Sequence, residues 1–545
     1  MVRRKTMKYR RKTMKRGAKR SGPKRSMSMS RVKRSMSMSR VKRSRRKNKN
    51  TKRKMRGGET VKEMVAKYEI IINENLENSE EISKENSEEN SEEKILKACL
   101  TACKALHPFI QSVYEVLNYD NLKNKSIITH KFTQFINEQK KNATTELSKQ
   151  KLNEKDIFTI ADGMVQYIIR KYLFNNPRHF VGEETIEVTR KDKDDNQIED
   201  EDEDEEIQVD QYILKQGSEE TVIPKVFTND INYAITKINN IKLDPTLFEN
   251  YTIFVDPIDG TAEYQGTDKR SAKEKSETNF IPKGEQATIM IGFADIKTKK
   301  AVGGIIFRPV KNEDKPEQAG TYAYGWVIDE TASTNNVYKS RLNMNTHEKT
   351  DQTIRFITSN GGISDPTKKL ITKIEGERIG SGGAGNKILM LLEDKADVYL
   401  QDRGLSRWDT CAGEAILRCK DGLLCKLTEF EKTGTTDSRY TYTTTDNISG
   451  EENPNNNVDK NTAAKYIEQN SFIPADLVKE FKKIKGNEEE LTNFIETHNI
   501  HHTATNNLCG LVAITGEKRY FLKDIYAEIQ KLPVNKSTGL RFDYD

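Results

Sequence analysis

The charge of this 545-residue chain is divided unevenly, and the division decides which part of it can bury a hydrophobic core. The first 58 residues hold 27 Lys and Arg and no Asp or Glu, whereas the remainder holds 64 basic and 83 acidic residues. A segment with so high a net charge and so few apolar side chains cannot bury enough surface to offset the entropy lost on folding. We therefore expect residues 1–58 to be a disordered basic tail and the fold to lie further along the chain.

The basic tail has a composition that favours a function of its own. It repeats "RRKTMK" and "RSMSMSRVK" twice each, and its charge suits salt-sensitive, sequence-independent binding of nucleic acid. The run "KRSRRK" resembles a nuclear localisation signal. We expect an intracellular protein, cytoplasmic or nuclear, with virion association if the source is viral. The sequence leaves its oligomeric state open.

The remaining composition indicates a soluble protein. No apolar run approaches the roughly 20 residues of a membrane span, so we expect no membrane partner. The six cysteines include no CxxC pair, which favours a reducing compartment. Cys99 and Cys103 lie one helical turn apart, and we expect both in the core.

The chain after the tail divides into a linker and one folded domain. Residues 59–94 are rich in acids and form the predicted linker, and residues 95–545 form the predicted domain. Insertions are expected near 186–220 and 430–470, where Lys191–Glu206 and Thr433–Lys465 are predicted to be solvated loops.

Helix and strand patterns alternate through the predicted domain. Helical spacing occurs at 95–117, 162–174, 387–393, 408–419 and 523–532, and strand-like runs occur at 251–257, 287–295, 302–310, 355–359, 397–401 and 510–515. This mixture predicts an α/β or α+β layered sandwich, with helices covering the faces of sheets. The strand order cannot be read from the sequence.

Carboxylates stand where several of these elements begin or end. Asp256 and Asp259 end the strand in "YTIFVDPIDGT", Glu183 and Glu184 follow "FVG", and Asp409 opens the helix "WDTCAGEAIL". Taken alone, each has an ordinary explanation: a turn, a solvated acidic pair, or a helix N-cap. Together they predict a site for Mg²⁺, which prefers carboxylate oxygens combined with water and phosphate.

Backbone N–H groups follow the second aspartate. Gly260 and Thr261 precede "AEY", a predicted helix start at which a phosphate could accept hydrogen bonds. The sequence thus brings a metal site and an anion site together.

These motifs resemble those of the inositol monophosphatase superfamily, whose members are Mg²⁺-dependent, lithium-sensitive phosphatases. "GEE", "DPIDGT" and "WDTCAGEAIL" occur in the order that the superfamily has, and the resemblance spans about Ile95 to Pro533 without the insertions. The stretch around "GGAGNK" is most similar to the 3′(2′),5′-bisphosphate nucleotidases. The resemblance implies removal of the 3′-phosphate from adenosine 3′,5′-bisphosphate, with two or three Mg²⁺ ions.

The resemblance also implies roles for individual residues. The metal ligands would be Glu183, Asp256, the Ile258 carbonyl, Asp259 and Asp409. Asp162 and Thr261 would orient the attacking water as the catalytic pair. The substrate contacts would be Gly260, Thr261, Thr358, Gly383 and Lys387. Gly361 stands where the nucleotidases have a histidine, which leaves the exact nucleotide open.

Two alternatives stand beside this reading. An inositol phosphate is the alternative substrate, although the inositol polyphosphate 1-phosphatases have a serine at the position of Gly260. A protein of another class is also open: a basic nucleic-acid-binding or virion-associated protein that uses a phosphatase-derived fold as a scaffold. The intact set of acids favours the enzyme.

Neither the three histidines near residue 500 nor Cys411 is expected to take part in the chemistry. His498, His501 and His502 lie in a polar segment with no cysteine nearby, and we expect a surface element there. Cys411 has no evident histidine base, so we expect it to pack in the core.

Overall fold

The structure is a computed structural model, and it describes the chain in separate ranges. These are residues 90–118, 154–184, 187–192, 197–198, 209–216, 219–265, 284–310, 320–329, 335–344, 353–360, 363–402, 405–434, 440, 442, 506–507, 510–534 and 541–542. Contacts divide the chain into residues 1–85 and 86–545, and every described residue belongs to the second unit. The predicted tail, most of the predicted linker, Gly361 and the three histidines near residue 500 lie outside the described residues.

A six-stranded sheet forms the centre of the described unit, in the order β1-β6-β7-β8-β9-β10. β1 runs parallel to β6, and the other neighbouring pairs are antiparallel. Its strands are β1 (Phe180–Gly182), β6 (Tyr251–Asp259), β7 (Thr288–Asp295), β8 (Ala301–Phe307), β9 (Tyr322–Trp326) and β10 (Val337–Arg341).

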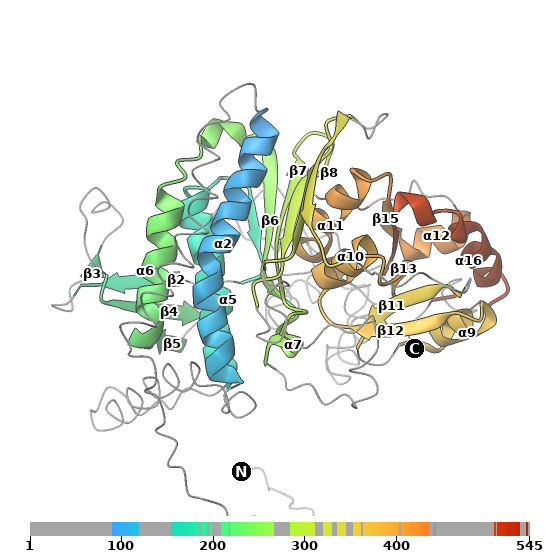
Figure 1. Ribbon diagram of the computed structural model, residues 1–545, viewed down its shortest axis with the longest axis horizontal. Helices are drawn as coiled ribbons and strands as arrows, with labels where there is room; N and C mark the ends of the chain where they lie inside the picture. Colours follow the sequence, from blue (N-terminus) through green and yellow to red (C-terminus); the bar gives the residue numbers. More distant parts are fainter. Residues whose placement is uncertain are drawn as a thin grey trace, which may run out of the picture. The chain divides into compact units, whose positions relative to one another are not determined.

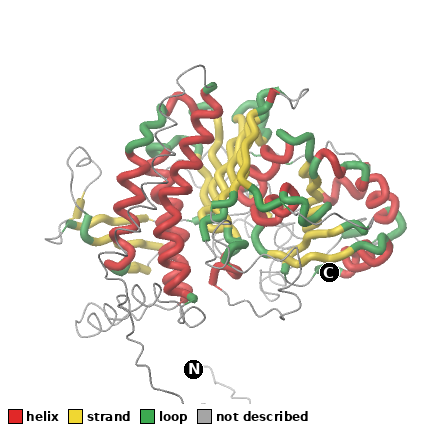
Figure 2. Tube along the Cα trace, viewed as in Figure 1, coloured by secondary structure: helices red, strands yellow, loops and turns green. Residues whose placement is uncertain are grey.

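Helices cover both faces of this sheet (Figures 1 and 2). α2 (Ser91–Leu117), α5 (Glu154–Ile168) and α6 (Lys225–Asn239) share one hydrophobic core with one face, and α10 (Ala384–Leu392) and α11 (Trp408–Arg418) share another with the opposite face. Successive side chains of β6 point alternately into these two cores. Ile253 and Val255 lie in the first core, and Phe254 lies in the second. The strand is buried on both sides, which is why it reads as a continuous apolar run.

A five-stranded sheet lies beyond α10 and α11. Its order is β12-β11-β13-β17-β15, and α9 (Asp365–Lys373), α12 (Leu427–Thr433) and α16 (Phe521–Ile529) cover its far face. Its strands are β11 (Arg355–Ser359), β12 (Glu377–Ser381), β13 (Val398–Gln401), β15 (Leu423–Lys426) and β17 (Leu511–Ile514). The layers thus alternate helix, sheet, helix, sheet, helix, which confirms the predicted layered sandwich.

The structure refines the predicted boundaries. α2 begins at Ser91, inside the predicted linker, because the Asn90 side chain accepts a hydrogen bond from the Glu93 N–H at 2.8 Å and caps the helix. The predicted insertion near 186–220 contains a small antiparallel sheet in the order β3-β2-β4-β5. Its strands are β2 (Glu187–Lys191), β3 (Gln197–Ile198), β4 (Gln211–Gln216) and β5 (Glu219–Val222).

The expectation that the second insertion is a solvated loop is wrong for two of its described residues. Tyr440 and Tyr442 lie within the predicted solvated loop, yet both are buried. The Tyr442 ring packs edge-on against Phe254, and its hydroxyl donates to Glu414 at 2.8 Å. Burial of a tyrosine ring is favourable when its hydroxyl has a hydrogen-bond partner. Because the neighbours of Tyr440 and Tyr442 in the sequence are polar, the sequence does not indicate that these two rings are buried.

Several core predictions are confirmed. Cys99 and Cys103 are buried on α2, and Cys411 is buried on α11. Among the helices of the described ranges, none is long and apolar enough to cross a bilayer.

A row of glycines lets α11 approach the six-stranded sheet closely. Gly304 pairs with Gly292 on one side and Gly325 on the other, so the three form a line across β7, β8 and β9. A Cβ on Gly304 would lie 2.5 Å from the Ala412 Cα, and one on Gly292 would lie 2.7 Å from the Ala412 nitrogen. The helix backbone therefore rests directly on the sheet.

Gly304→Ala should destabilise the protein by about 1–3 kcal/mol, because the new methyl group meets backbone atoms that cannot rotate away. Gly380→Ala is the matched control, since its nearest contact would be an ordinary 3.5 Å. Denaturant unfolding of both variants measures the difference. Equal stabilities would show that α11 can move off the sheet at no cost.

Candidate active site

A β-bulge places two aspartates on one side of β6. Asp256 pairs with Met290 and Asp259 pairs with Thr288, so three steps along β6 match two steps along β7. Residues three apart in a regular strand point to opposite faces. The extra residue reverses that alternation, and both carboxylates face the layer of α10 and α11.

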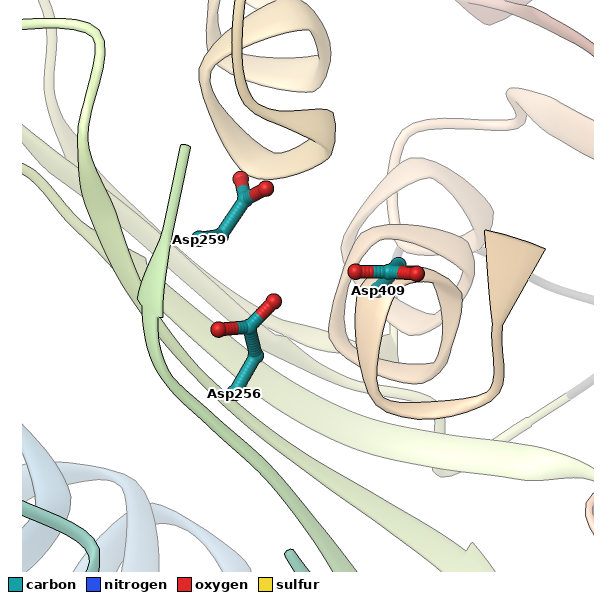
Figure 3. A group of neighbouring side chains, drawn as sticks. All are labelled: Asp256, Asp259 and Asp409. Carbon is teal, nitrogen blue, oxygen red and sulfur yellow. The ribbon is translucent and has the colours of Figure 1, made fainter. Parts of the chain in front are cut away.

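α11 brings the third aspartate to the same place. Asp409 lies in its first turn, where one carboxylate oxygen accepts from the Ser406 N–H at 2.6 Å. Asp256, Asp259 and Asp409 each offer a carboxylate oxygen, and these atoms lie within 4.8 Å of one another (Figure 3). Residues 256, 259 and 409, distant in sequence, thus form one acidic cluster.

The N-terminus of α10 holds Asp259. Its carboxylate accepts from the Ala384 N–H at 2.8 Å, from the Gly385 N–H at 2.7 Å and from the Thr288 hydroxyl at 2.9 Å. Gly383 precedes this helix with φ of +63°, and a Cβ there would lie 2.9 Å from Asp259 Oδ2. The predicted close approach at Gly383 therefore involves the chain's own aspartate in this structure.

The loop after β1 adds two more carboxylates. Glu183 shares a side-chain hydrogen bond with Asp256, and Glu184 shares one with Asp162 of α5. Gln166, one turn along α5, fixes this loop. Its amide donates to the Glu184 carbonyl at 2.5 Å and accepts from the Glu184 N–H at 2.9 Å.

Asp162 has surroundings that bear on its predicted role. Its carboxyl bonds with Glu184 and accepts from the Ile258 N–H, while its Oδ1 has no hydrogen-bond partner among the described residues. Thr261 opens the short helix α7 (Thr261–Gln265), directly after Gly260 with φ of +92°. In this structure the Asp162 carboxyl forms its side-chain hydrogen bond with Glu184, and the pairing of Asp162 with Thr261 stays a prediction.

Two predicted substrate residues are already engaged by the protein. Lys387 is buried, with Nζ donating to the Gly383 carbonyl at 3.0 Å and lying 5.2 Å from the centre of the Tyr399 ring. The Thr358 hydroxyl accepts from Arg378 Nε at 2.9 Å. Their contacts with a substrate stay predictions.

Burial and mutual repulsion raise the pKa values of the clustered acids. Burial, followed by the charge of Asp409, raises the pKa of Glu183 to about 8, and burial with the charge of Asp259 raises that of Asp409 to about 6. The pKa of Asp256 is also raised, first by burial and then by Glu183. Burial lowers the pKa of Lys387, although the charges of Asp259, Glu263 and Asp409 oppose the change. A low-dielectric site with this many acids favours a cation.

The donor set fits a divalent metal ion. All its side-chain ligands are carboxylate oxygens, the hard donors that Mg²⁺ prefers. Asp256 is buried, and its Oδ1 has no hydrogen-bond partner in the described part of the chain. Buried polar atoms are rarely left unsatisfied, and a cation would satisfy this one. The identity of the metal and the number of ions stay predictions.

Comparison with known proteins identifies the family to which this chain belongs. Residues 121–469 match the inositol monophosphatase family, and because the match covers more than half of the chain, the protein belongs to that family. It is a phosphoric monoester hydrolase.

Two curated relatives have different names but similar identities. Inositol polyphosphate 1-phosphatase of Mus musculus is 27% identical over 330 residues, which cover 54% of this chain and 77% of that protein. 3′(2′),5′-Bisphosphate nucleotidase 1 of Rattus norvegicus is 27% identical over 289 residues, which cover 50% of this chain and 73% of that protein.

The solved structures found to be similar are more distant. Inositol monophosphatase II of Staphylococcus aureus has a TM-score of 0.31 at 12% identity, covering 72% of this chain and 93% of that one. The inositol monophosphatase of Zymomonas mobilis has a TM-score of 0.30 at 11% identity, and the match covers 70% of this chain and 100% of that one.

Several residues that hold the site carry no recognisable motif in the sequence. Thr288 could be found only from its pairing opposite Asp259, and Gln166 only from its spacing of one helical turn after Asp162. Gln286 is completely buried and accepts from the Gly382 N–H at 2.7 Å. No local pattern marks it.

The raised pKa of Glu183 predicts a pH-dependent stability of the metal-free protein. Because the folded pKa lies above the ordinary 4.5, this group stabilises the fold fully below about pH 4.5, and the contribution is lost as pH rises through about 8. Thermal unfolding in EDTA should show this loss across that window, and added Mg²⁺ should reverse it at the alkaline end. Glu183→Gln should flatten the slope, whereas Glu187→Gln, at an exposed position, should keep it. Identical slopes in the two variants would contradict the assignment.

Proposed function

We propose that the protein is a Mg²⁺-dependent phosphatase that removes the 3′-phosphate of adenosine 3′,5′-bisphosphate, giving AMP and phosphate. The observation that carries the proposal is the clustering of Asp256, Asp259 and Asp409 within 4.8 Å. Structural acids are seldom buried together without a cation partner, since each charge raises the cost of the next.

Glu183, the three clustered aspartates and the Ile258 carbonyl are the proposed ligands for two or three Mg²⁺ ions. Bound Mg²⁺ would supply positive charge to the phosphate and increase the acidity of water. Asp162 and Thr261 are proposed to orient the attacking water and to accept its proton. The water oxygen would bond to phosphorus as the bond from phosphorus to the ribose 3′ oxygen breaks, and that oxygen would take a proton from a solvent water molecule. Gly260, Thr261, Thr358, Gly383 and Lys387 are the proposed substrate contacts.

The choice of nucleotide rests on local motifs. "GGAGNK" is similar to the nucleotidases, and Gly260, at φ of +92°, stands where the inositol polyphosphate 1-phosphatases have serine. The mouse relative is named for an inositol polyphosphate and the rat relative for a bisphosphate nucleotide, each at 27% identity. An inositol phosphate is therefore the second candidate.

A substrate panel tests this choice. Phosphate release with Mg²⁺ should be fastest for adenosine 3′,5′-bisphosphate, slower for inositol 1,4-bisphosphate and slowest for inositol 1-phosphate. Li⁺ should inhibit more than Na⁺ at equal ionic strength. A preference for an inositol substrate would reject the nucleotide proposal and leave the phosphatase class intact.

Asp256→Asn should lower kcat by about 10²–10³-fold, because it removes charge at the cluster and preserves side-chain size. Thermal unfolding should show a folded protein, since relief of repulsion offsets the lost hydrogen bonds. Asp244→Asn is the matched control: Asp244 is exposed and caps a short helix by accepting from the Thr246 N–H, a role that asparagine keeps. Unchanged kcat in Asp256→Asn would reject the metal site.

A further inference from the structure

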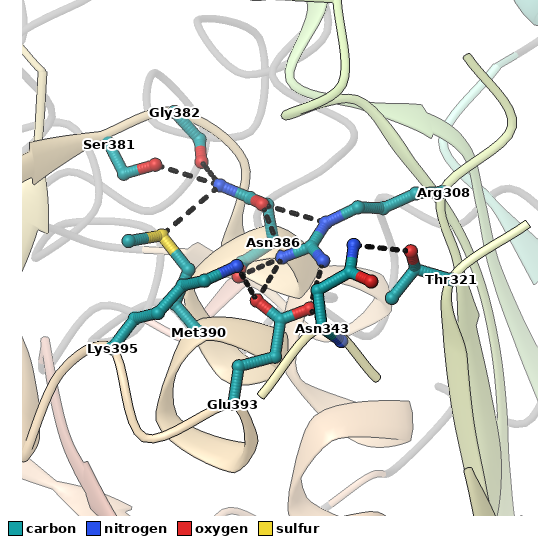
Figure 4. A network of polar contacts seen from close by, with 9 residues as sticks. All are labelled: Arg308, Thr321, Asn343, Ser381, Gly382, Asn386, Met390, Glu393 and Lys395. Atoms are coloured by element: carbon teal, nitrogen blue, oxygen red, sulfur yellow. Dashed lines mark hydrogen bonds and ion pairs between the residues drawn. The ribbon is translucent and has the colours of Figure 1, made fainter. Parts of the chain in front are cut away.

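Arg308 is a buried cation outside the acidic cluster, and it binds both ends of α10 (Figure 4). It follows the end of β8 and is 3% exposed. Its guanidinium reaches Asn386 in the first turn of the helix and Glu393 just after the last. One side chain of the central sheet thus fixes the position of the helix that contacts Asp259.

At the helix start, Arg308 acts through an amide. Its Nε and Nη2 donate to Asn386 Oδ1 at 3.0 and 2.8 Å. Asn386 Nδ2 in turn donates to the Ser381 hydroxyl at 2.7 Å and to the Gly382 carbonyl at 3.2 Å. The amide is thereby oriented on one side by the guanidinium and on the other by the loop before α10.

At the helix end, Arg308 forms a buried ion pair. Its Nη1 donates to Glu393 Oε1, and Nη2 lies 3.3 Å from Oε2. Glu393 is fully buried, and Lys395 binds its Oε2 at 2.9 Å. The Glu393 carboxylate therefore has two cationic partners, and it keeps one of them when the other is removed.

The loop held by Asn386 leads directly to the acidic cluster. Ser381 and Gly382 precede Gly383, and the next two residues donate their N–H groups to Asp259. A shift of the loop would move both donors together. The contacts form a continuous path from Arg308 through Asn386 to the carboxylate.

We propose that Arg308 is a positioning residue for the metal site: it holds the first turn of α10 so that the Ala384 and Gly385 N–H groups keep the Asp259 carboxylate aimed into the cluster. The inference rests on the proposed metal role of Asp259. Arginine is required because its planar guanidinium presents several donors in fixed directions, and these reach the amide and the carboxylate at once. A lysine ammonium keeps the charge and loses this geometry.

Three variants separate positioning from stability. Arg308→Lys keeps a cation beside Glu393 and loses the paired donors to Asn386. Arg308→Met removes the cation and leaves Glu393 paired with Lys395. Lys395→Met is the matched control, because it removes the other partner of Glu393 and leaves the contacts with Asn386 intact.

Two measurements on the full-length protein need no substrate. Mn²⁺ titration followed by electron paramagnetic resonance measures metal affinity, and hydrogen exchange followed by NMR measures protection of the Ala384 and Gly385 amides in the metal-free protein. We expect both Arg308 variants to bind Mn²⁺ about tenfold more weakly or worse, the usual effect of losing a residue that orients a ligand. The two amides should exchange faster, while Lys395→Met should match the wild type in both respects.

Each remaining outcome has a defined meaning. Wild-type Mn²⁺ affinity and amide protection in Arg308→Lys would overturn the positioning role, and this variant decides the question if Arg308→Met does not fold. Equal losses in Lys395→Met would also overturn it, because they would assign the effect to the ion cluster. Absence of Mn²⁺ binding in the wild type would instead reject the proposed metal site, and amide exchange would still test the hold on the loop.

Discussion

The close contact between α11 and the six-stranded sheet is the packing on which the rest of the structure depends. Gly292, Gly304 and Gly325 remove side chains from the line where the helix lies, so the backbone at Ala412 rests on the strands. This contact brings the first turn of α11 to the bulged end of β6. A side chain at Gly292 or Gly304 would meet the backbone of α11 and hold the helix away from the strands.

Concentrating carboxylates in a buried place carries a cost that the fold offsets only in part. The N-terminus of α10, the Thr288 hydroxyl and the charge of Lys387 all favour the ionised form of Asp259. Burial nevertheless raises the pKa of Asp259, and burial together with neighbouring acids raises the pKa values of Glu183 and Asp256. A bound cation would relieve the repulsion among these acids, as would neutral side chains in their place.

Much of the architecture could be predicted because it depends on local patterns. Apolar spacing predicts strands at 251–257 and 287–295 and helices at 95–117, 408–419 and 523–532. The structure confirms these elements as β6, β7, α2, α11 and α16, with bounds that differ by a few residues. Two buried residues in a polar insertion could not be predicted in this way. Tyr440 and Tyr442 pack in the core although their neighbours in the sequence are polar, because burial is decided by the surface available elsewhere in the fold.

The sequence by itself determined which residues are the candidates for the chemistry: acids at the ends of apolar elements, a glycine after the second aspartate, and motifs that resemble those of one phosphatase superfamily. Only the tertiary structure decided how they meet. The bulge that turns Asp259 to the side of Asp256, the pairing of Thr288 opposite it, and the path from Arg308 to the start of α10 all join segments far apart in the chain. Strand register and helix packing arise from contacts between such segments, and no local pattern encodes them.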